Sequence, residues 1–123
     1  MSALVAVAVA GGLGAPARYV LDAFVADRAG GVFPWGTLVV NVSGSLVLGM
    51  VTGLALYHGL GELPRVAAGA GFCGAYTTFS TFSYETVRLL EDGSVLEAGL
   101  NVGASLVVGA LAAAVGLAVM AVA

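Results

Sequence analysis

The sequence predicts an all-α membrane protein with four transmembrane helices in one domain. Of its 123 residues, 60% are hydrophobic and only 9% are charged, and the mean hydropathy is +1.07. Because a soluble globular domain carries about 25% charged residues, this composition excludes a water-soluble fold. A hydrocarbon core about 30 Å thick needs about 20 apolar residues per helix. Four such runs divide the domain, 1–123, at about residues 2–26, 35–58, 64–90 and 95–122.

The first run begins MSALVAVAVA and contains no Lys or Arg before Arg18. A secretory signal needs a positively charged stretch ahead of its apolar segment, so we expect this run to remain in the protein as a membrane span. Arg18 lies inside the run, and an ionisable side chain within a span indicates a functional or polar structural site. The acid of this span, Asp22, lies toward its end.

The second run follows a Gly-containing loop, 26–31, and begins at Phe33-Pro34-Trp35. Proline suits the first turn of a helix, and tryptophan suits the membrane interface. The next loop, 58–64, has a similar pattern, in which Gly favours the end of one helix and Pro favours the start of the next. The last loop, 91–94, places acidic side chains near a helix N-terminus, where the helix dipole favours them. All three connections are tight, so neighbouring helices are predicted to run antiparallel.

The third run contains GFCGAYTTFSTFSYE, residues 71–85, in an otherwise apolar chain. Gly71, Gly74, Thr77 and Thr78 weaken the helix in the middle of the span, and a break there frees backbone groups that need partners. Discontinuous helices of this kind build ion sites, in which carbonyls coordinate a cation and an amide-rich end favours an anion. The alternative is an unbroken helix whose Ser and Thr hydroxyls bond back to i−4 carbonyls.

The same segment carries two phenylalanines on one helix face, Phe79 and Phe82. Such residues often only pack, but an aromatic ring has a positive edge. Ring edges beside Ser and Thr donors would therefore favour a small anion where water is scarce. Glu85 follows, and it either belongs to this polar surface or snorkels and pairs with Arg88 at i+3.

The second and fourth runs carry similar polar stripes with a spacing of four residues. Asn41-Ser45-Gly49 and Asn101-Ser105-Gly109 each lie along one helix face, and both runs have the same direction. One interpretation is small-residue packing with polar side chains as interhelical glue. The other is a pair of polar tracks facing a narrow polar path, because an amide left in lipid is costly.

The arginines give little bias in orientation. Arg28 and Arg88 flank loops on one side, Arg65 lies on the other side, and Arg18 lies within the first span; the chain contains no lysine. Since Lys and Arg near the helix ends set orientation, a two-to-one split permits insertion both ways. The sequence therefore permits an antiparallel dimer.

The sequence contains no set of residues typical of an enzyme. His58 stands alone in a loop, there is no Cys/His metal spacing or phosphate-binding loop, and the single Cys73 cannot form an internal disulfide. We expect a protein that is not an enzyme.

Several motifs together identify a resemblance to a known family. They are Gly11-Gly12-Leu13-Gly14-Ala15 with Arg18-Tyr19, Gly36-Thr37-Leu38 with Asn41 and Gly44, Gly71-Phe72 with Gly74, TTFSTFS at 77–83, and Asn101 with Ser105. On these residues the chain resembles the Fluc/CrcB fluoride channels over its whole length. It departs from that pattern at Ala75-Tyr76, where Gly and an aliphatic residue are expected, and at Gly109, where a hydroxyl is expected.

The resemblance implies an antiparallel, dual-topology homodimer of four-helix subunits, with the third helix broken at mid-membrane. It implies two pores, a structural Na⁺ ion at the two-fold axis, and passive export of fluoride from the cytoplasm that lowers fluoride toxicity. It also implies a multi-pass protein of a prokaryotic plasma membrane, the cell inner membrane.

The resemblance also assigns roles to individual residues. The backbone carbonyls of Gly74 and Thr77 would bind the sodium ion, and Arg18 would mark the wide aqueous vestibule. The fluoride pore would be lined by Asn41, Phe79, Ser80, Thr81, Phe82, Ser83, Glu85 and Ser105.

Two alternative functions stay open from the sequence. The first is a non-conducting or half-functional subunit of a heterodimeric fluoride channel, a kind of subunit found among members of the family that the chain resembles. Small four-helix multidrug exporters match it in size, but those coupled transporters need an intramembrane carboxylate in the first span, whereas Asp22 lies toward the end of that span here.

Overall fold

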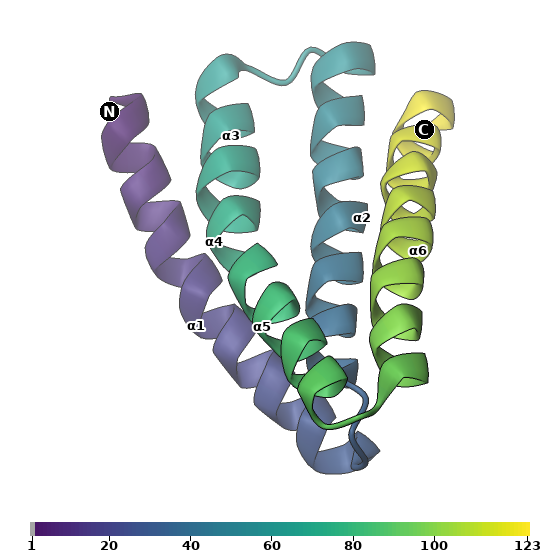
Figure 1. The fold of residues 1–123 in the computed structure, drawn as a ribbon. Helices are drawn as coiled ribbons and strands as arrows, with labels where there is room; N and C mark the ends of the chain where they lie inside the picture. Colours follow the sequence, from purple (N-terminus) through teal and green to yellow (C-terminus); the bar gives the residue numbers. More distant parts are fainter. Residues whose placement is uncertain (1) are drawn as a thin grey trace.

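The computed structural model describes residues 2–123, and the elements it contains are helices. Three of these helices are long and apolar enough to cross a membrane: α1, α2 and α6. The predicted all-α membrane fold is therefore confirmed. In chain order the helices are α1 (Ala3–Ala29), α2 (Trp35–Tyr57), α3 (Glu62–Val66), the π-helix η1 (Ala67–Cys73), α4 (Gly74–Tyr76), α5 (Phe79–Glu91) and α6 (Val95–Val122) (Figure 1).

The third segment of the chain is composite, because α3, η1 and α4 form one continuous helical stretch that ends before α5 begins. The predicted break in the third helix is thus confirmed. In Figure 1, α1, α2, the composite segment with α5, and α6 alternate in direction, so the N- and C-termini lie at the same end of the molecule. That arrangement follows from the three short connections, each of which reverses the chain.

Helices α2 and α6 run parallel and pack closely through glycines. A Cβ atom added at Gly49 would overlap the carbonyl group of Ala113, and one added at Gly53 would lie 3.2 Å from the Leu117 carbonyl oxygen. Both contacts pair an α2 residue with the α6 residue 64 positions later (49 with 113, 53 with 117). Small residues allow such close approach between membrane helices.

This register brings the two polar stripes side by side. It places Asn41 at the level of Ser105 and Thr37 at the level of Asn101. The contact at Gly109 agrees, since a Cβ atom there would lie 3.7 Å from the Ser45 hydroxyl oxygen. The polar residues of α2 and α6 therefore form one surface, and α5 packs against both helices.

Helix α1 packs against the first half of the composite segment, η1 and α4. Gly14 of α1 is buried, and its Cα faces the backbone of Phe72 and Tyr76 so closely that a Cβ would overlap the Phe72 carbonyl oxygen. From the other side, a Cβ on Gly71 would lie 2.9 Å from the Ala10 methyl group. Glycines on both elements thus bring the two backbones together.

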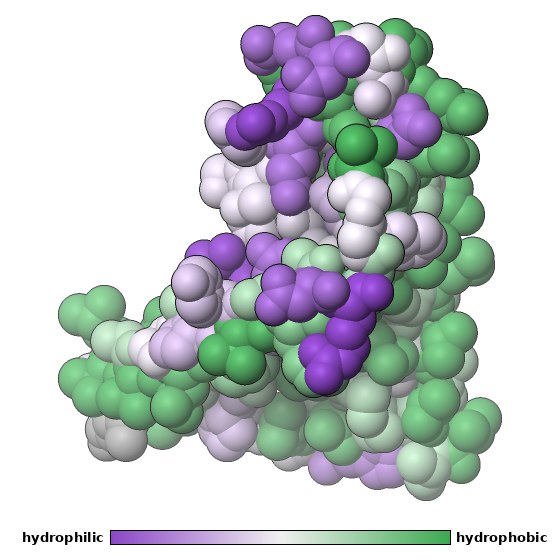
Figure 2. All heavy atoms as spheres, turned by 90° about the horizontal axis from the view of Figure 1, so that it is seen from below, coloured by the Kyte–Doolittle hydropathy of each residue, from purple (hydrophilic) through white to green (hydrophobic). Residues whose placement is uncertain are grey.

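Charged residues gather at the end where α1 and α5 finish. Figure 2 views the molecule from this end and shows hydrophilic side chains grouped together, with mainly hydrophobic side chains along the flanks. The sequence places Asp27, Arg28, Glu91 and Asp92 beside the connections there. This distribution suits a protein whose flanks face lipid and whose ends face water.

Candidate functional site

The helix break lies at Thr77 and Thr78, and one short helical piece, Gly74–Tyr76, separates it from the π-helix. Both residues are extended, with φ/ψ of −76°/160° at Thr77 and −145°/121° at Thr78. Helix α5 restarts at once because Thr78 caps it: the Thr78 hydroxyl oxygen accepts a hydrogen bond of 3.1 Å from the Thr81 amide. The glycines that weaken the third run remain helical, since the chain widens into a π-helix through Cys73 before it breaks.

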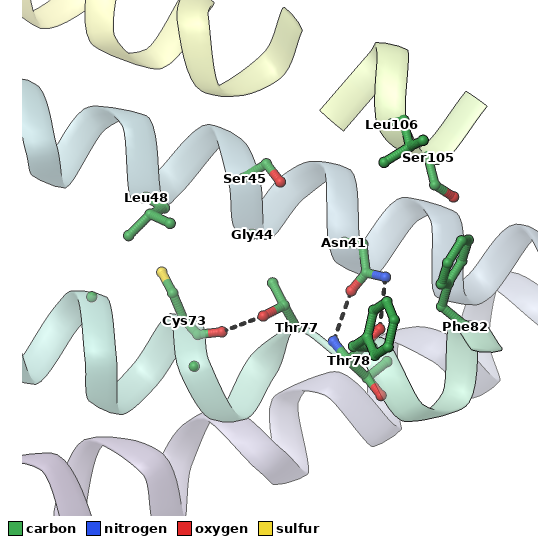
Figure 3. Close-up of a pocket in the computed structure, with 13 residues that line it drawn as sticks. Asn41, Gly44, Ser45, Leu48, Cys73, Thr77, Thr78, Phe82, Ser105 and Leu106 are labelled. Carbon is green, nitrogen blue, oxygen red and sulfur yellow. Dashed lines mark hydrogen bonds between the residues drawn. The ribbon is translucent and has the colours of Figure 1, made fainter. Parts of the chain in front are cut away.

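Asn41 of α2 stabilises this break with two hydrogen bonds to the Thr78 backbone (Figure 3). Its Nδ2 donates to the Thr78 carbonyl at 2.9 Å, and its Oδ1 accepts from the Thr78 amide at 2.8 Å. A backbone break within a membrane needs such partners, because lipid offers none. Asn41 is therefore both a site residue and the structural support of the break.

These bonds leave two carbonyls without the donors that a continuous helix would give them. In an α-helix the Thr78 amide would donate to Gly74 and the Thr81 amide to Thr77, but they donate to Asn41 and to the Thr78 hydroxyl instead. The Thr77 hydroxyl does not compensate, since it donates to the Cys73 carbonyl at 2.8 Å. The freed carbonyls include those of Gly74 and Thr77. The carbonyls of Ala75 and Tyr76 lose their helical donors as well, because α4 ends at Tyr76 and α5 begins at Phe79.

A partly open cavity of about 360 Å³ lies beside the break, between α2, the composite segment and α6. Its lining combines the polar stripes of α2 and α6 with the residues on both sides of the break (Figure 3). Of the residues predicted for the pore and the sodium site, it brings together Asn41, Gly74, Thr77, Phe79, Phe82 and Ser105.

The two phenylalanines lie near one another on the first turn of α5. Their ring centroids are 6.0 Å apart with an angle of 43° between the ring planes. Phe79 is 79% exposed, whereas Phe82 is partly buried. A large ring left open at the mouth of the cavity is available to a further partner.

The other predicted site residues lie outside the lining of this cavity. Ser80 is exposed and lies 3.4 Å from the Thr78 hydroxyl oxygen, and Thr81 and Ser83 are partly buried on α5. Glu85 lies two turns into α5, beside Thr37 of α2. Arg18 is partly buried on α1. The structure thus groups six of the predicted residues in one cavity and distributes the remaining five.

A second polar cluster extends from the cavity along α2, α5 and α6. Among residues 2–123, the buried side-chain polar atoms without a hydrogen-bond partner belong to four residues of these helices: Thr37, Glu85, Asn101 and Ser105. Thr37 is 2% exposed and Asn101 is 0% exposed. The expected alternative of a Glu85–Arg88 ion pair is not formed, because Arg88 donates to the Tyr84 hydroxyl oxygen at 3.2 Å and Glu85 lies beside Thr37.

Three residues near the site, Thr37, Thr86 and Asn101, were assigned no pore or sodium role from the sequence, although Asn101 lies on one of the two predicted polar tracks. The signal for Thr37 and Asn101 was the four-residue spacing, since Thr37 precedes Asn41 by one turn and Asn101 precedes Ser105. No sequence pattern marked Thr86, because its contact is a hydrogen bond from Asn101 of the neighbouring helix α6.

Tyr76, which departs from the resemblance pattern, packs beside the break with its polar group satisfied. Its side chain is buried, its ring stacks on Phe72 with centroids 5.6 Å apart, and its hydroxyl forms a 2.8 Å hydrogen bond with Ser43. Gly44 makes room for it, because a Cβ there would lie 3.2 Å from the Tyr76 ring. A satisfied hydroxyl and a facing glycine thus accommodate the extra bulk.

Comparison with known proteins gives consistent matches. Residues 5–117 match the family model described as CrcB-like protein, Camphor Resistance (CrcB). The chain is 59% identical over 88 residues to fluoride-specific ion channel FluC 1 of Leifsonia xyli subsp. xyli, covering 72% of this chain and 64% of that protein.

Two further relatives are matched over more of their length. The chain is 49% identical to fluoride-specific ion channel FluC of Geobacter sulfurreducens over 106 residues, which is 85% of this chain and 86% of the relative. It is 49% identical to fluoride-specific ion channel FluC 1 of Streptomyces avermitilis over 105 residues, or 85% of each protein.

Proposed function

The chain belongs to the CrcB-like protein family, and we infer from this membership that it is a fluoride-selective ion channel rather than an enzyme. It is a multi-pass bacterial membrane protein that releases fluoride passively and so reduces fluoride toxicity. The observation that carries this function is the polar cavity at a helix break in an otherwise apolar chain. Such a cavity suits an ion path, and the relatives are named as fluoride-specific ion channels.

The chemistry of the cavity suits a compact anion. Fluoride is a small, strongly hydrated acceptor, so it needs several donors in exchange for its water. The groups beside the break include the Asn41 amide, the Ser105 hydroxyl and the rings of Phe79 and Phe82, and ring edges are electropositive. Chloride is larger and fits a narrow path of this kind less well.

The two helix ends at the break favour opposite charges. Helix α5 begins at Phe79, and the amides of its first turn point toward the break, which favours an anion. Helix α4 ends at Tyr76, and its carbonyl end favours a cation. We propose that fluoride passes on the α5 side, along Phe79, Ser80, Thr81, Phe82, Ser83, Asn41, Glu85 and Ser105, with Arg18 at the entrance.

We propose that the composite segment is a fourth membrane crossing and that two copies of the chain form an antiparallel dimer. The support is the exposed face at the break: Gly74 and Phe79 are exposed, and the Gly74 and Thr77 carbonyls lack their helical donors. Lipid cannot satisfy such carbonyls. A second copy related by a two-fold axis would cover this face with the same groups.

The same carbonyls would hold a structural Na⁺ ion at the dimer axis. Gly74 and Thr77 of each subunit would supply four carbonyl oxygens, and oxygen ligands suit hard cations. Unwound carbonyls at a helix break are a recurrent means of binding Na⁺ in membrane proteins. The loss of helical donors across the break, which includes Gly74 and Thr77, supports the proposal.

Reconstitution of the purified chain alone tests the proposed function. Liposomes loaded with fluoride or chloride are made permeable to K⁺ with an ionophore, and each anion is followed with its own electrode. We expect fluoride to leave rapidly and chloride to remain. Comparable fluxes of both anions would contradict fluoride selectivity, and no fluoride flux would indicate a subunit that needs a distinct partner chain.

Labelling of a single cysteine tests the antiparallel arrangement. Cys73 is replaced by Ala, and a cysteine is introduced at Ala29, an exposed residue beside the first loop, because the positive φ of 63° at the neighbouring Gly30 disfavours a side chain there. We expect a membrane-impermeant reagent to label about half of the protein from each side, since the arginine bias is weak. Labelling from one side only would contradict the antiparallel homodimer.

A further inference from the structure

We propose that Asn101 of α6 is a positioning residue for Phe82, acting through the hydroxyl of Thr86. The proposal rests on the proposed fluoride channel function, because it assigns a residue that holds the pore ring in place. It does not require Asn101 or Thr86 to contact fluoride.

The connection consists of two hydrogen bonds in series. The Asn101 Nδ2 donates to the Thr86 Oγ1 at 2.9 Å, and the Thr86 Oγ1 donates to the carbonyl oxygen of Phe82 at 2.8 Å. The second bond ends on the backbone of the residue whose ring lines the cavity. A side chain of α6 is thereby fixed to the turn of α5 that carries this ring.

The direction of these bonds is determined by their chemistry. A threonine hydroxyl has one proton, and Thr86 uses it toward the Phe82 carbonyl, which can only accept. The Thr86 oxygen must therefore accept from Asn101, so the NH₂ group of the amide faces Thr86 and Oδ1 faces away. An amide turned the other way would place two acceptors against each other.

Asn101 is enclosed, which makes this single contact costly to lose. Its side chain is 0% exposed, and its Oδ1 has no hydrogen-bond partner within residues 2–123. The amide is thus buried between apolar helices with only its Nδ2 end bonded inside the chain. Leaving a buried polar atom unsatisfied costs about 1–3 kcal/mol, so removal of the one bond that Asn101 makes would add to that cost.

Asn41 and Asn101 hold α5 at two points on either side of Phe82. Asn41 bonds the backbone of Thr78, four residues before Phe82, and Asn101 bonds the side chain of Thr86, four residues after it. The two amides come from different helices, α2 and α6. Together they fix both the rotation of α5 and its distance from the polar stripes.

The test compares variants of Thr86 with a matched control. Thr86→Val keeps the shape of the side chain but removes the hydroxyl, and Thr86→Ser keeps the hydroxyl. Thr52→Val is the control, since Thr52 makes the same i−4 bond, to the Leu48 carbonyl at 2.8 Å, on the exposed side of α2. Fluoride efflux per folded dimer should fall about tenfold in Thr86→Val and stay near the wild-type rate in Thr86→Ser and Thr52→Val.

Asn101→Leu removes the amide group that donates to the Thr86 hydroxyl. It should therefore reduce fluoride efflux to the same degree as Thr86→Val. The double variant should be no slower than either single variant, because both changes break one connection. If Asn101→Leu fails to fold, Thr86→Val still carries the test, since it replaces only the hydroxyl with a methyl group.

A readout of the ring itself separates positioning from direct contact with the ion. With 4-fluorophenylalanine at position 82, the ¹⁹F NMR signal in fluoride-free detergent should shift or split in Thr86→Val and stay unchanged in Thr86→Ser. Full efflux in Thr86→Val, or reduced efflux with an unchanged ring signal, would overturn the proposal. This NMR comparison reports on the ring even if the wild-type chain alone does not conduct, so failure of the proposed function is recognised separately.

Discussion

The two halves of the composite segment, 62–76 and 79–91, lie on either side of one break but are held by different means. The first half packs against α1 through close backbone contacts at Gly14 and Gly71. The second half is held by side-chain hydrogen bonds from Asn41 and Asn101. Backbone contacts leave no room for added atoms, whereas hydrogen-bonded side chains leave a cavity between the helices.

This difference suggests a division of tasks within the segment. The first half anchors the segment in the fold, and the second half presents its rings and hydroxyls to the cavity. Substitutions in the first contact should therefore affect folding, and substitutions in the second should affect conduction more than folding.

The largest expected effect is that of Gly14→Val in the α1 contact. Any Cβ there would overlap the Phe72 carbonyl oxygen and lie 3.2 Å from the Tyr76 amide. Overpacking of a fitted interior costs about 1–3 kcal/mol, and two further methyl groups place this variant at the upper end. We expect little folded protein by size-exclusion chromatography and a lowered melting temperature by circular dichroism.

Gly12→Val is the matched control on the same helix, because a Cβ at Gly12 has no atom within 4 Å. A stable Gly14→Val protein, or equal loss in both variants, would contradict the anchoring role of the first half.

The next effect is that of Asn41→Leu, which removes both hydrogen bonds to the break. Leucine keeps the approximate size but leaves the Thr78 amide and carbonyl without these partners. An unsatisfied backbone group costs about 1–3 kcal/mol when it is fully buried, but both lost bonds are only partly buried, so their combined cost should stay below that of the Gly14 clash. We expect a lower melting temperature and loss of fluoride efflux in the protein that still folds. Wild-type efflux with wild-type stability would show that the break does not depend on Asn41.

Removal of sodium should lower fluoride efflux and stability through its effect on the helix break between the two halves of the composite segment. If the Gly74 and Thr77 carbonyls bind Na⁺ between subunits, replacing all Na⁺ with N-methyl-D-glucamine should slow efflux and lower the melting temperature of the dimer. A bound ligand stabilises only the folded state, so adding Na⁺ back should restore both. Full activity and stability under stringent sodium depletion would exclude the site.

The smallest effect is expected for Gly109→Ser, which adds a hydroxyl where the resemblance pattern has one. A Cβ at Gly109 would lie 3.7 Å from the Ser45 hydroxyl oxygen, which is an ordinary contact. We expect a change in stability within about 0.5 kcal/mol and nearly unchanged efflux, both measured as above.

Gly116→Ser on the same helix is the contrasting variant, because a Cβ there would overlap the Leu46 carbonyl oxygen. Clear destabilisation at position 109, or none at position 116, would contradict the packing of α6 on α2.

The sequence predicted most of this architecture because the membrane imposes a simple rule on length and hydropathy. Apolar runs of sufficient length anticipated α1, α2 and α6, and Gly and Thr in the third run anticipated the broken helix. The position of the break was less predictable. Gly71 and Gly74 stay helical, and the chain becomes extended only at Thr77 and Thr78, where Asn41 supplies partners for the Thr78 backbone.

The cavity was predictable in part and for a physical reason. Residues of one helix can be grouped from their spacing, so Phe79 and Phe82 were assigned together. The register between α2 and α6 depends on glycine contacts far apart in the sequence, such as Gly49 with Ala113. The partnership of Asn101 with Thr86 therefore could not be read from either helix alone.

The most direct test of the proposed fluoride path is efflux from liposomes that contain Phe79→Ile or Phe82→Ile, compared with the wild type at equal dimer density. Isoleucine keeps apolar bulk but lacks the electropositive ring edge. We predict that both variants fold and keep the oligomeric state of the wild type while fluoride efflux falls strongly. Normal efflux in both variants would leave the phenylalanines as packing residues and would contradict a fluoride path along the second half of the segment.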